Sequence, residues 1–234
     1  MKLIIIAAGQ GSRIRSVTNG IPKTLLKLKG KTLLDRLLEN AISVGIKDAI
    51  IVTGYRSQDL ETYIDNHRFD INIETVFNAD WSNENGVSVL AAKPLISDGE
   101  PFLISMSDHI YDAQLLEKVF SVSLEDYDAL VGLDFRINKI YDIDDGMKVS
   151  VDKNNKLKII DMSKKLSRYD AIDCGVFKCS FSFFDTLESA SESGNSSLAD
   201  GCNLLINDGR MGGIDIGDSF WMDVDTPDAF EFLA

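Results

Sequence analysis

The chain has 234 residues, of which 44% are hydrophobic and 26% are charged, a composition typical of one globular domain. Its formal net charge of −13 argues against general binding to nucleic acid or anionic membranes, and the lack of any run of 18 apolar residues argues against a membrane-spanning helix. The cysteines at positions 174, 179 and 202 form no disulfide framework, so we expect a reducing, cytoplasmic compartment.

In the first 134 residues, segments typical of buried strands alternate with segments typical of amphipathic helices. Residues 3–8 are a continuous apolar run, as in a strand buried on both faces of a parallel sheet. Residues 31–44 place apolar side chains on one helical face, and Gly45 ends that helix. Ser57 is a candidate N-cap for the next helix. The other expected strands are 48–53, 71–77, 102–106 and 129–134, and the other helices are 57–66, 87–93 and 112–120.

The second half of the chain has a different pattern. Strand-like segments at 148–151 and 157–162 flank a polar stretch, which predicts a hairpin. A strand at 171–179, helices at 181–190 and 198–207, a strand at 211–216 and a last helix after Thr226-Pro227 follow. The expected fold class is α/β, a three-layer, doubly wound and mostly parallel sheet with an antiparallel extension.

No internal repeat or low-complexity linker divides the sequence, so we expect residues 1–234 to form a single domain. The last helix is barely two turns long. The chain is therefore either naturally short at this end or the N-terminal part of a longer, bifunctional protein.

The segment after the first strand combines glycines with basic residues. Gly9 and Gly11 allow a sharp turn that presents backbone N–H groups to phosphate oxygens. Arg13 and Lys23 add cationic donors suited to a triphosphate. The spacing differs from the Walker A and dinucleotide-binding motifs. The full pattern is Ala-Ala-Gly-x-Gly-x-Arg, followed by Pro-Lys ten residues after Arg13.

This pattern resembles the signature of the sugar-phosphate nucleotidyltransferases, Leu-x-x-Gly-x-Gly-x-Arg followed by Pro-Lys, with Ile6 in place of leucine. The resemblance extends over almost the whole chain, since the later motifs occur in the family's order. It implies a Rossmann-like nucleotidyltransferase fold and catalytic roles for Arg13 and Lys23. It also implies a nucleotide-binding loop that contains Ala7, Ala8, Gly9 and Gly11.

Asp108 follows the expected strand 102–106, at the edge where open α/β sheets bind ligands. The family has an aspartate here that holds Mg²⁺, usually after a glycine that Ser107 replaces. A cap or turn role is the alternative for a single aspartate. His109 is a poor candidate for a general base, because the attacking oxyanion of this chemistry is already deprotonated.

Asp223 and Asp225 are two residues apart, so in a strand they would project from the same face. Neighbouring carboxylates repel each other unless a cation or a proton lies between them. With Asp108 they would form an oxygen-rich site suited to Mg²⁺. The resemblance places a metal ligand at Asp223, and cytidylyltransferases of the family often have acidic residues at both positions. The alternative is that Asp225 only helps Thr226 to cap the last helix.

The segment Asn85-Gly86-Val87-Ser88 is similar to the Asn-Gly-x-Ser segment of the inositol-1-phosphate cytidylyltransferases. In those enzymes it lies against the nucleoside, which implies nucleotide binding by Asn85, Gly86 and Ser88. The resemblance also implies acceptor binding by Lys164, Asp173 and Gly175. A surface lysine is the plainer interpretation of Lys164. The acidic residues at 142, 144 and 145 are either a solvated loop or attract an amine to the acceptor pocket.

The resemblance predicts a magnesium-dependent cytidylyltransferase that transfers CMP from CTP to a small phosphomonoester or phosphonate. Inositol-1-phosphate is the acceptor of the most similar enzymes, but its best-known use is in solutes of hyperthermophiles. Thirteen asparagines and several Asn-Gly and Asp-Gly pairs are untypical of hyperthermophiles, so choline phosphate and aminoalkyl phosphonates are also candidate acceptors.

Two other functions remain open at this point. One is a hexose-1-phosphate uridylyl- or thymidylyltransferase, and the other is a non-catalytic nucleotide-sensing domain. A fused downstream domain that uses the product and a homo-oligomeric state also remain open.

Overall fold

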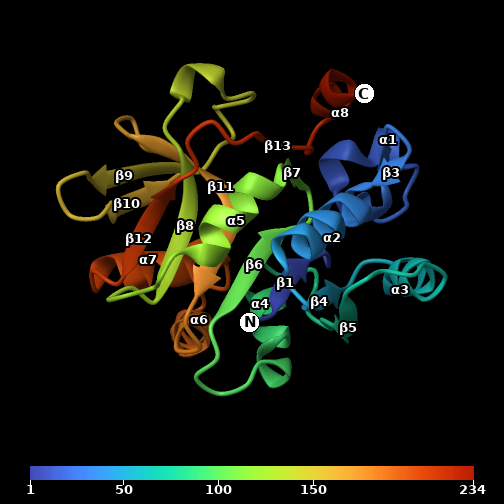
Figure 1. Cartoon of the computed structure of the whole chain (residues 1–234), viewed down its shortest axis with the longest axis horizontal. Coiled ribbons are helices and arrows are strands. Elements are labelled where there is room, and N and C mark those ends of the chain that lie inside the picture. Colours follow the sequence, from blue (N-terminus) through green and yellow to red (C-terminus); the bar gives the residue numbers. More distant parts are fainter.

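The computed structural model describes residues 1–234 and is built around a nine-stranded sheet (Figure 1). The strand order is β5 (Asn72–Phe77), β4 (Asp48–Thr53), β1 (Leu3–Ile6), β6 (Phe102–Met106), β11 (Ala171–Cys179), β8 (Ala129–Asp134), β12 (Met211–Asp215), β10 (Lys158–Ser163) and β9 (Lys148–Asp152). β5, β4, β1 and β6 are parallel neighbours, and β11 runs antiparallel to both β6 and β8. The antiparallel strands therefore extend the same sheet rather than forming a layer of their own.

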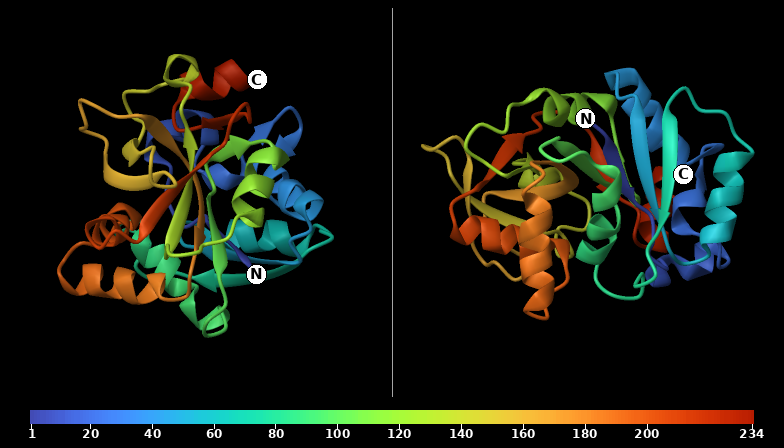
Figure 2. Two further views of the ribbon diagram at one scale, coloured as in Figure 1. Left: turned by 60° about the vertical axis from the view of Figure 1, so that its left-hand side comes forward. Right: turned by 90° about the horizontal axis from the view of Figure 1, so that it is seen from below.

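Helices cover both faces of this sheet, which gives the expected three layers (Figure 2). One hydrophobic cluster joins one face to α2 (Leu33–Val44), α3 (Ser57–Asp65) and α5 (Ala113–Ser121). The larger cluster joins the other face to α4 (Gly86–Ala91), α6 (Phe183–Glu192) and α7 (Leu198–Asn207). The continuous apolar sequence of β1 follows from this arrangement, because Ile4 belongs to one cluster and Ile5 to the other.

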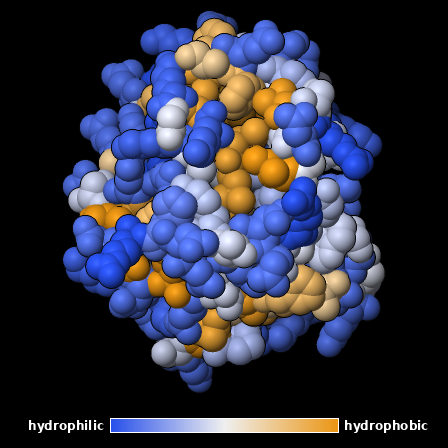
Figure 3. Space-filling model, turned by 90° about the vertical axis from the view of Figure 1, so that its right-hand side faces the viewer, coloured by the Kyte–Doolittle hydropathy of each residue, from blue (hydrophilic) through white to orange (hydrophobic).

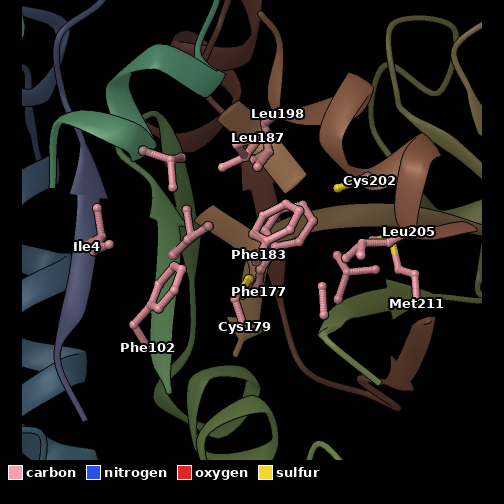
Figure 4. Close-up of a cluster of buried hydrophobic side chains, with 14 of the residues drawn as sticks. Ile4, Phe102, Phe177, Cys179, Phe183, Leu187, Leu198, Cys202, Leu205 and Met211 are labelled. Carbon is pink, nitrogen blue, oxygen red and sulfur yellow. The ribbon is translucent and has the colours of Figure 1, made fainter. Parts of the chain in front are cut away.

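Aromatic side chains fill the larger cluster between the sheet and α6 (Figure 4). The ring of Phe102 on β6 stacks on that of Phe184 with centroids 4.4 Å apart, and both residues are fully buried. Burying one such side chain contributes about 1.5–3 kcal/mol. The buried cysteines Cys179 and Cys202 lie in the same cluster and are free thiols.

The helix boundaries follow local capping chemistry. Thr32 caps α2 in a reciprocal capping box with Asp35, and Gly45 ends α2 in the left-handed conformation. α7 begins at Leu198, as the sequence predicts, because Ser197 forms a second capping box. The predicted N-cap of α3 is wrong by one residue, since Arg56 occupies it with φ +49° and Ser57 is already the first helical residue.

Several short elements were not predicted. β7 (His109–Tyr111) and β13 (Trp221–Asp223) form an antiparallel ribbon, and β2 (Lys27–Leu28) pairs with β3 (Lys31–Thr32). α1 (Arg15–Thr18) and the 3-10 turns Ser12–Ile14, Lys23–Leu25, Lys93–Leu95 and Ile137–Lys139 complete the set. α8 (Pro227–Leu233) follows the predicted cap, because the Thr226 hydroxyl accepts from the N–H of Ala229.

None of the helices combines the length and the apolar character that crossing a bilayer requires.

The face shown in Figure 3 is mainly hydrophilic and has a hydrophobic area above its centre. Phe232 on α8 is the most exposed large hydrophobic side chain, and its ring lies 4.9 Å from that of Tyr141.

Candidate active site

The glycine-rich loop leaves β1 and turns over Lys23. Gly11 has φ +61°, and a Cβ atom at this position would lie 3.1 Å from Cβ of Lys23. Both the conformation and the close approach therefore require glycine here. Gly9 is exposed, and a Cβ atom there would meet no atom within 4 Å. The start of the loop is fixed by the N–H of Tyr55, which donates to the carbonyl of Ala8 at 2.9 Å.

The ammonium group of Lys23 lies among three carboxylates. Its Nζ is 3.1 Å from Oδ2 of Asp108 and 3.9 Å from Oδ1 of Asp223, and it forms an ion pair with Asp225. The Lys23 side chain is only 7% exposed. Burial alone would lower the pKa of Lys23, but the three carboxylates outweigh burial and raise it. Lys23 is therefore a buried, permanently charged cation.

The β7–β13 ribbon sets the spacing of the carboxylates. Asp223 lies opposite His109 in the ribbon, and the N–H of Val224 donates to the carbonyl of Asp108 at 2.9 Å. These contacts bring Asp108 next to Asp223 although 115 positions, the difference of their residue numbers, separate them in sequence. The β7–β13 ribbon, which was not predicted, thus brings Asp108 and Asp223 together, and Lys23 contacts both of them as well as Asp225.

Asp225 lies beyond the end of β13 rather than in a strand beside Asp223. It does not cap α8, because the Thr226 side chain provides that cap. Instead its two oxygens form ion pairs with Lys23 and Arg13. Burial alone would lower the pKa of Arg13, but hydrogen bonding and nearby carboxylates raise it. Asp225 thus links the two basic residues of the glycine-rich segment.

His109 is held as a cation. Its Nδ1 lies 2.9 Å from Oδ1 of Asp108, and its ring stacks on that of Trp221 with centroids 5.8 Å apart. Burial alone would lower the pKa of His109, but Asp108 and the neighbouring carboxylates raise it to about 9. Because an imidazolium cannot accept a proton, this geometry agrees with the prediction that His109 is not a general base.

Asp173 and Gly175 lie where β11 departs from regular pairing with β8. Gly175 has φ +73°, and a Cβ atom there would come within 2.8 Å of the His109 ring. The N–H of Gly175 donates to Oδ1 of Asp173 at 2.7 Å. Burial raises the pKa of Asp173 to about 6. Gly175 therefore makes room for His109 and orients the Asp173 carboxylate.

The carboxylate of Asp223 is a candidate ligand for a metal ion. Its Oδ1 is buried without a hydrogen-bond partner, and burial raises the pKa of Asp223 to about 7. Ligand atoms of Asp108, His109 and Asp223 lie within 4.8 Å of one another, and so do those of Asp145, Asp223 and Asp225. A buried carboxylate oxygen without a hydrogen bond is unfavourable, and the ammonium group of Lys23 comes no closer to it than 3.9 Å. The oxygen donors present fit a hard divalent cation such as Mg²⁺.

A pocket of about 280 Å³ opens beside the glycine-rich loop. Its lining is mostly polar and includes Gly9, Gly11, Ser12, Arg13, Lys23, Thr24, Trp81, Asn83, Asn85, Ser88, Ser107, Asp108 and Asp225. Sequence reasoning did not single out Ser12, Thr24 or Trp81 as site residues. Only their proximity to the motif residues in sequence could have suggested Ser12 and Thr24.

Three predicted nucleotide-binding residues do not line this pocket. The side chains of Ala7 and Ala8 belong to the two hydrophobic clusters. Gly86 is buried, and a Cβ atom there would lie 2.5 Å from the carbonyl oxygen of Ser196. Any contact of Ala7 and Ala8 with a nucleotide would have to come from their backbone.

Asn85 and Ser88 do line the pocket, and both also support the structure. Oδ1 of Asn85 accepts from the N–H of Leu198, the first residue of α7, at 2.9 Å. The Ser88 hydroxyl accepts from Nδ2 of Asn78 at 3.0 Å. The amide NH₂ group of Asn85 is not used in any of these bonds.

A larger pocket of about 500 Å³ adjoins the first. Arg13, Asn85, Met106, Asp108 and Asp225 line both pockets, so the carboxylate cluster lies at their boundary. The larger pocket contains all three predicted acceptor residues, Lys164, Asp173 and Gly175. Its apolar lining includes Tyr141, Met147, Met162, Phe177, Leu198 and Trp221. The two-pocket arrangement suits two separate substrates.

Lys164 is paired in the larger pocket. Its Nζ lies 2.8 Å from Oδ1 of Asp145, whose Oδ2 is 2.5 Å from NH1 of Arg13. A hydrogen bond from Lys164, opposed by partial burial, lowers the pKa of Asp145. Asp145 was not distinguished from the other acidic residues of its loop by sequence. It connects Arg13 of the glycine-rich segment to Lys164, and both line the larger pocket.

Comparison with known proteins gives a consistent result. The family model described as nucleotidyl transferase matches residues 2–233. The chain is 32% identical over 231 residues to the bifunctional IPC transferase and DIPP synthase of Aquifex aeolicus, covering 97% of this chain and 50% of that protein. It is 29% identical over 226 residues to the protein of the same name from Rubrobacter xylanophilus, covering 95% and 49%. The chain thus spans about half the length of these curated relatives.

The fold matches solved structures over nearly the whole chain. The inositol-1-phosphate CTP transferase from T. maritima has a TM-score of 0.87 and 23% identity, covering 99% of this chain and 94% of that one. UDP-glucose pyrophosphorylase complexed with UDP-glucose has a TM-score of 0.82 and 16% identity, covering 99% and 96%. The family match, the fold and the ordered motifs agree, and this chain belongs to the nucleotidyl transferase family.

Proposed function

We propose that this nucleotidyltransferase is a magnesium-dependent cytidylyltransferase that uses CTP and a small phosphomonoester or phosphonate. In the proposed reaction, an acceptor oxygen bonds to the α-phosphorus of CTP, and the bond between that phosphorus and the bridging oxygen of pyrophosphate breaks. The electron pair of the broken bond leaves with pyrophosphate. The observation that carries the proposal is the position of Lys23 in the smaller pocket, paired with Asp108 and Asp225, which line both pockets.

The smaller pocket suits the nucleotide. Backbone N–H groups of the Gly9–Gly11 turn and the side chains of Arg13 and Lys23 can bind the triphosphate. The amides of Asn83 and Asn85 can donate to the acceptor atoms of a pyrimidine edge. The relatives named for IPC transferase activity and the T. maritima CTP transferase support cytosine as the base.

We further propose that Asp108, Asp223 and Asp225 hold Mg²⁺. When bound there, the ion supplies charge neutralisation at the phosphates. Lys23 and Arg13, now paired with these carboxylates, would turn to the transferred phosphoryl group and offset the charge that builds up on it. The protonated His109 would hold Asp108 in place through its Nδ1. None of these residues has to accept a proton, because the attacking oxygen of the acceptor is already ionised.

The larger pocket suits the acceptor. Lys164 and Arg13 can bind its phosphate or phosphonate group, and Asp173 can accept from a hydroxyl or an amine. Seven carboxylates line this pocket, those of Glu84, Asp108, Asp142, Asp145, Asp173, Asp223 and Asp225. This excess of negative charge supports choline phosphate or an aminoalkyl phosphonate, whereas the relatives support inositol-1-phosphate.

Pyrophosphate release should be measured across a matrix of CTP, UTP, dTTP and GTP against four acceptors. These are inositol-1-phosphate, choline phosphate, 2-aminoethylphosphonate and glucose-1-phosphate, with and without Mg²⁺. We expect turnover with CTP and at least one of the first three acceptors. Turnover only with glucose-1-phosphate and UTP or dTTP would establish the hexose-1-phosphate alternative. Nucleotide binding without any turnover would support the sensing domain.

We also propose that the nucleotide-activated product is consumed by a partner activity. The relatives are described as bifunctional, and this chain covers about half of them. Sequencing the parent gene on both sides of the segment encoding this chain tests whether such an activity is fused to it. A gene that encodes only these residues would mean that a separate enzyme consumes the product.

A further inference from the structure

We infer that the Asp145 carboxylate occupies the binding position of the acceptor's anionic group. When the acceptor binds, its anionic group displaces Asp145. This inference rests on the proposed function of the larger pocket. Asp145 uses both carboxylate oxygens, one toward Arg13 and one toward Lys164. These are the arginine and the lysine that line the larger pocket, whose third basic group, His109, is already paired with Asp108. A single anion therefore already bridges the two cations that an acceptor phosphate would need.

The geometry shows that one small anion can satisfy both cations. Nζ of Lys164 is 2.8 Å from Oδ1 of Asp145, and NH1 of Arg13 is 2.5 Å from Oδ2. The oxygens of a phosphate or phosphonate group are spaced similarly to those of a carboxylate, and the group carries more charge and more acceptor oxygens. An acceptor group placed between Arg13 and Lys164 would therefore compete well with Asp145.

The ion pairs of Asp145 are weak enough to exchange. The side chains of Arg13 and Lys164 are about half exposed, and that of Asp145 is 38% exposed. Such exposed pairs contribute little to stability because water screens them. By contrast, Lys23 is 7% exposed and is held by several carboxylates. Exchange at Asp145 is therefore easier than exchange at Lys23.

Hydrogen bonds near Asp145 hold the segment that carries Lys164 in place, while the loop that carries Asp145 can still shift. Lys148 is buried, and its Nζ donates to the carbonyls of Asp144 at 3.3 Å and Lys164 at 2.9 Å. This bond pair ties the loop to the segment that carries Lys164. Tyr141, Asp142 and Asp144 of the same loop are exposed, and the first two line the larger pocket. A small movement of the loop can thus withdraw Asp145 without separating Lys164 from its support.

The test measures binding of inorganic phosphate to the metal-free, nucleotide-free protein at constant ionic strength, by calorimetry. Asp145→Asn removes the competing charge from Lys164 and Arg13, although Arg13 keeps its ion pair with Asp225, so we expect phosphate to bind at least about fivefold more tightly than to the wild type. Asp144→Asn is the matched control. It makes the same charge change one residue away, at an exposed side chain with no ion pair, and should change the affinity by less than about twofold.

A third variant shows where the phosphate binds. Adding Lys164→Ala to Asp145→Asn should return the affinity to about the wild-type level. Equal effects of the Asp145 and Asp144 variants would overturn the inference, because only long-range charge would then matter. Weaker binding by Asp145→Asn would also overturn it, since Asp145 would then position Lys164 for the anion.

Thermal unfolding checks that each variant is folded, and Asp145→Ser replaces Asp145→Asn if the amide destabilises the loop. The assay requires no turnover, so it separates this inference from the proposed function. The expected affinities in a protein that transfers no nucleotide would refute only the proposed function. Unchanged affinities in an active cytidylyltransferase would refute only the role of Asp145.

Discussion

Lys23 and Asp108 are 85 positions apart in sequence, yet Nζ of one lies 3.1 Å from Oδ2 of the other. This contact joins the glycine-rich segment to the carboxyl end of β6. Burial alone would raise the pKa of Asp108, but Lys23 and His109 lower it well below its usual range. The Lys23 ammonium group thus contacts the same carboxylates that would bind a divalent cation.

Replacement of Lys23 tests this central contact. Lys23→Ala should lower turnover by at least about a hundredfold, because a charged donor aimed at the transferred group is lost. The variant should remain folded, with a lower unfolding temperature since buried carboxylates lose their partner. Steady-state pyrophosphate release and thermal unfolding provide the two measurements. Near-normal turnover by a folded variant would contradict the assignment of Lys23.

Gly11 and Gly9 form a matched pair for the glycine-rich loop. Gly11→Ala should cost roughly 1–2 kcal/mol of unfolding free energy, because φ is +61° and Lys23 is 3.1 Å from the added Cβ. Gly9→Ala should change stability by less than about 0.5 kcal/mol, since no atom lies within 4 Å of its Cβ. Denaturant unfolding distinguishes the two. Equal effects would mean that the turn does not constrain Gly11.

Asp223 links metal binding to pH. Burial raises the pKa of Asp223 to about 7, so its folded-state pKa lies above the unfolded value. This carboxyl therefore costs stability progressively as the pH rises from about 4 to 7. Asp223→Asn should consequently be more stable than the wild type at pH 8 in a chelator.

Added Mg²⁺ should reverse that order, because the ion stabilises the wild-type carboxylate cluster and binds the variant weakly. Thermal unfolding with chelator and with Mg²⁺ measures both effects. Asp228→Asn is a suitable control, because Asp228 on α8 carries a carboxylate outside both pockets. If Mg²⁺ does not change the unfolding temperature of the wild-type protein, either with or without nucleotide, the proposed metal site is ruled out.

The protonation of His109 can be observed directly. The chain has two histidines, so the imidazole NMR signals of His109 are identified by their loss in His109→Gln. In the metal-free protein they should titrate with a midpoint near 9, because the neighbouring carboxylates raise the pKa. The raised folded-state pKa means that the stabilisation from His109 is full below about pH 6.5 and is lost as the pH rises through about 9. A midpoint below 7 would exclude the charged state.

Much of the fold could be predicted from the sequence. Mostly apolar runs identified β1, β4, β6 and β8, because strands buried on both faces have few polar positions. The end of α2 at Gly45 and the cap of α8 at Thr226 followed from local turn and capping chemistry, whereas the capping boxes of Thr32 and Ser197 were not predicted. The cap of α3 could not be predicted, since Arg56 at φ +49° depends on the turn after β4 rather than on a capping side chain.

The candidate site was only partly predictable. The sequence predicted Lys23, Asp108 and Asp223 as site residues, and the structure brings them together. The ribbon that joins the two aspartates has three residues in each strand, too few for a periodic signal. Asp145 was one of several acidic residues in a loop and gained its distinct position only through contacts with Arg13 and Lys164. The side chains of Ala7 and Ala8, by contrast, lie in the core.

The sequence by itself determined the longer strands and helices and which residue types could bind phosphate and metal, because hydrophobic periodicity and turn chemistry act over a few neighbouring residues. The tertiary structure decided which charged groups meet. Lys23 lies among carboxylates at the ends of β6 and β13, and Asp145 bridges Arg13 and Lys164. Both arrangements arise because the sheet order and the β7–β13 ribbon bring together residues that are far apart in the chain. Charge interactions depend on distance in space, which local sequence does not contain.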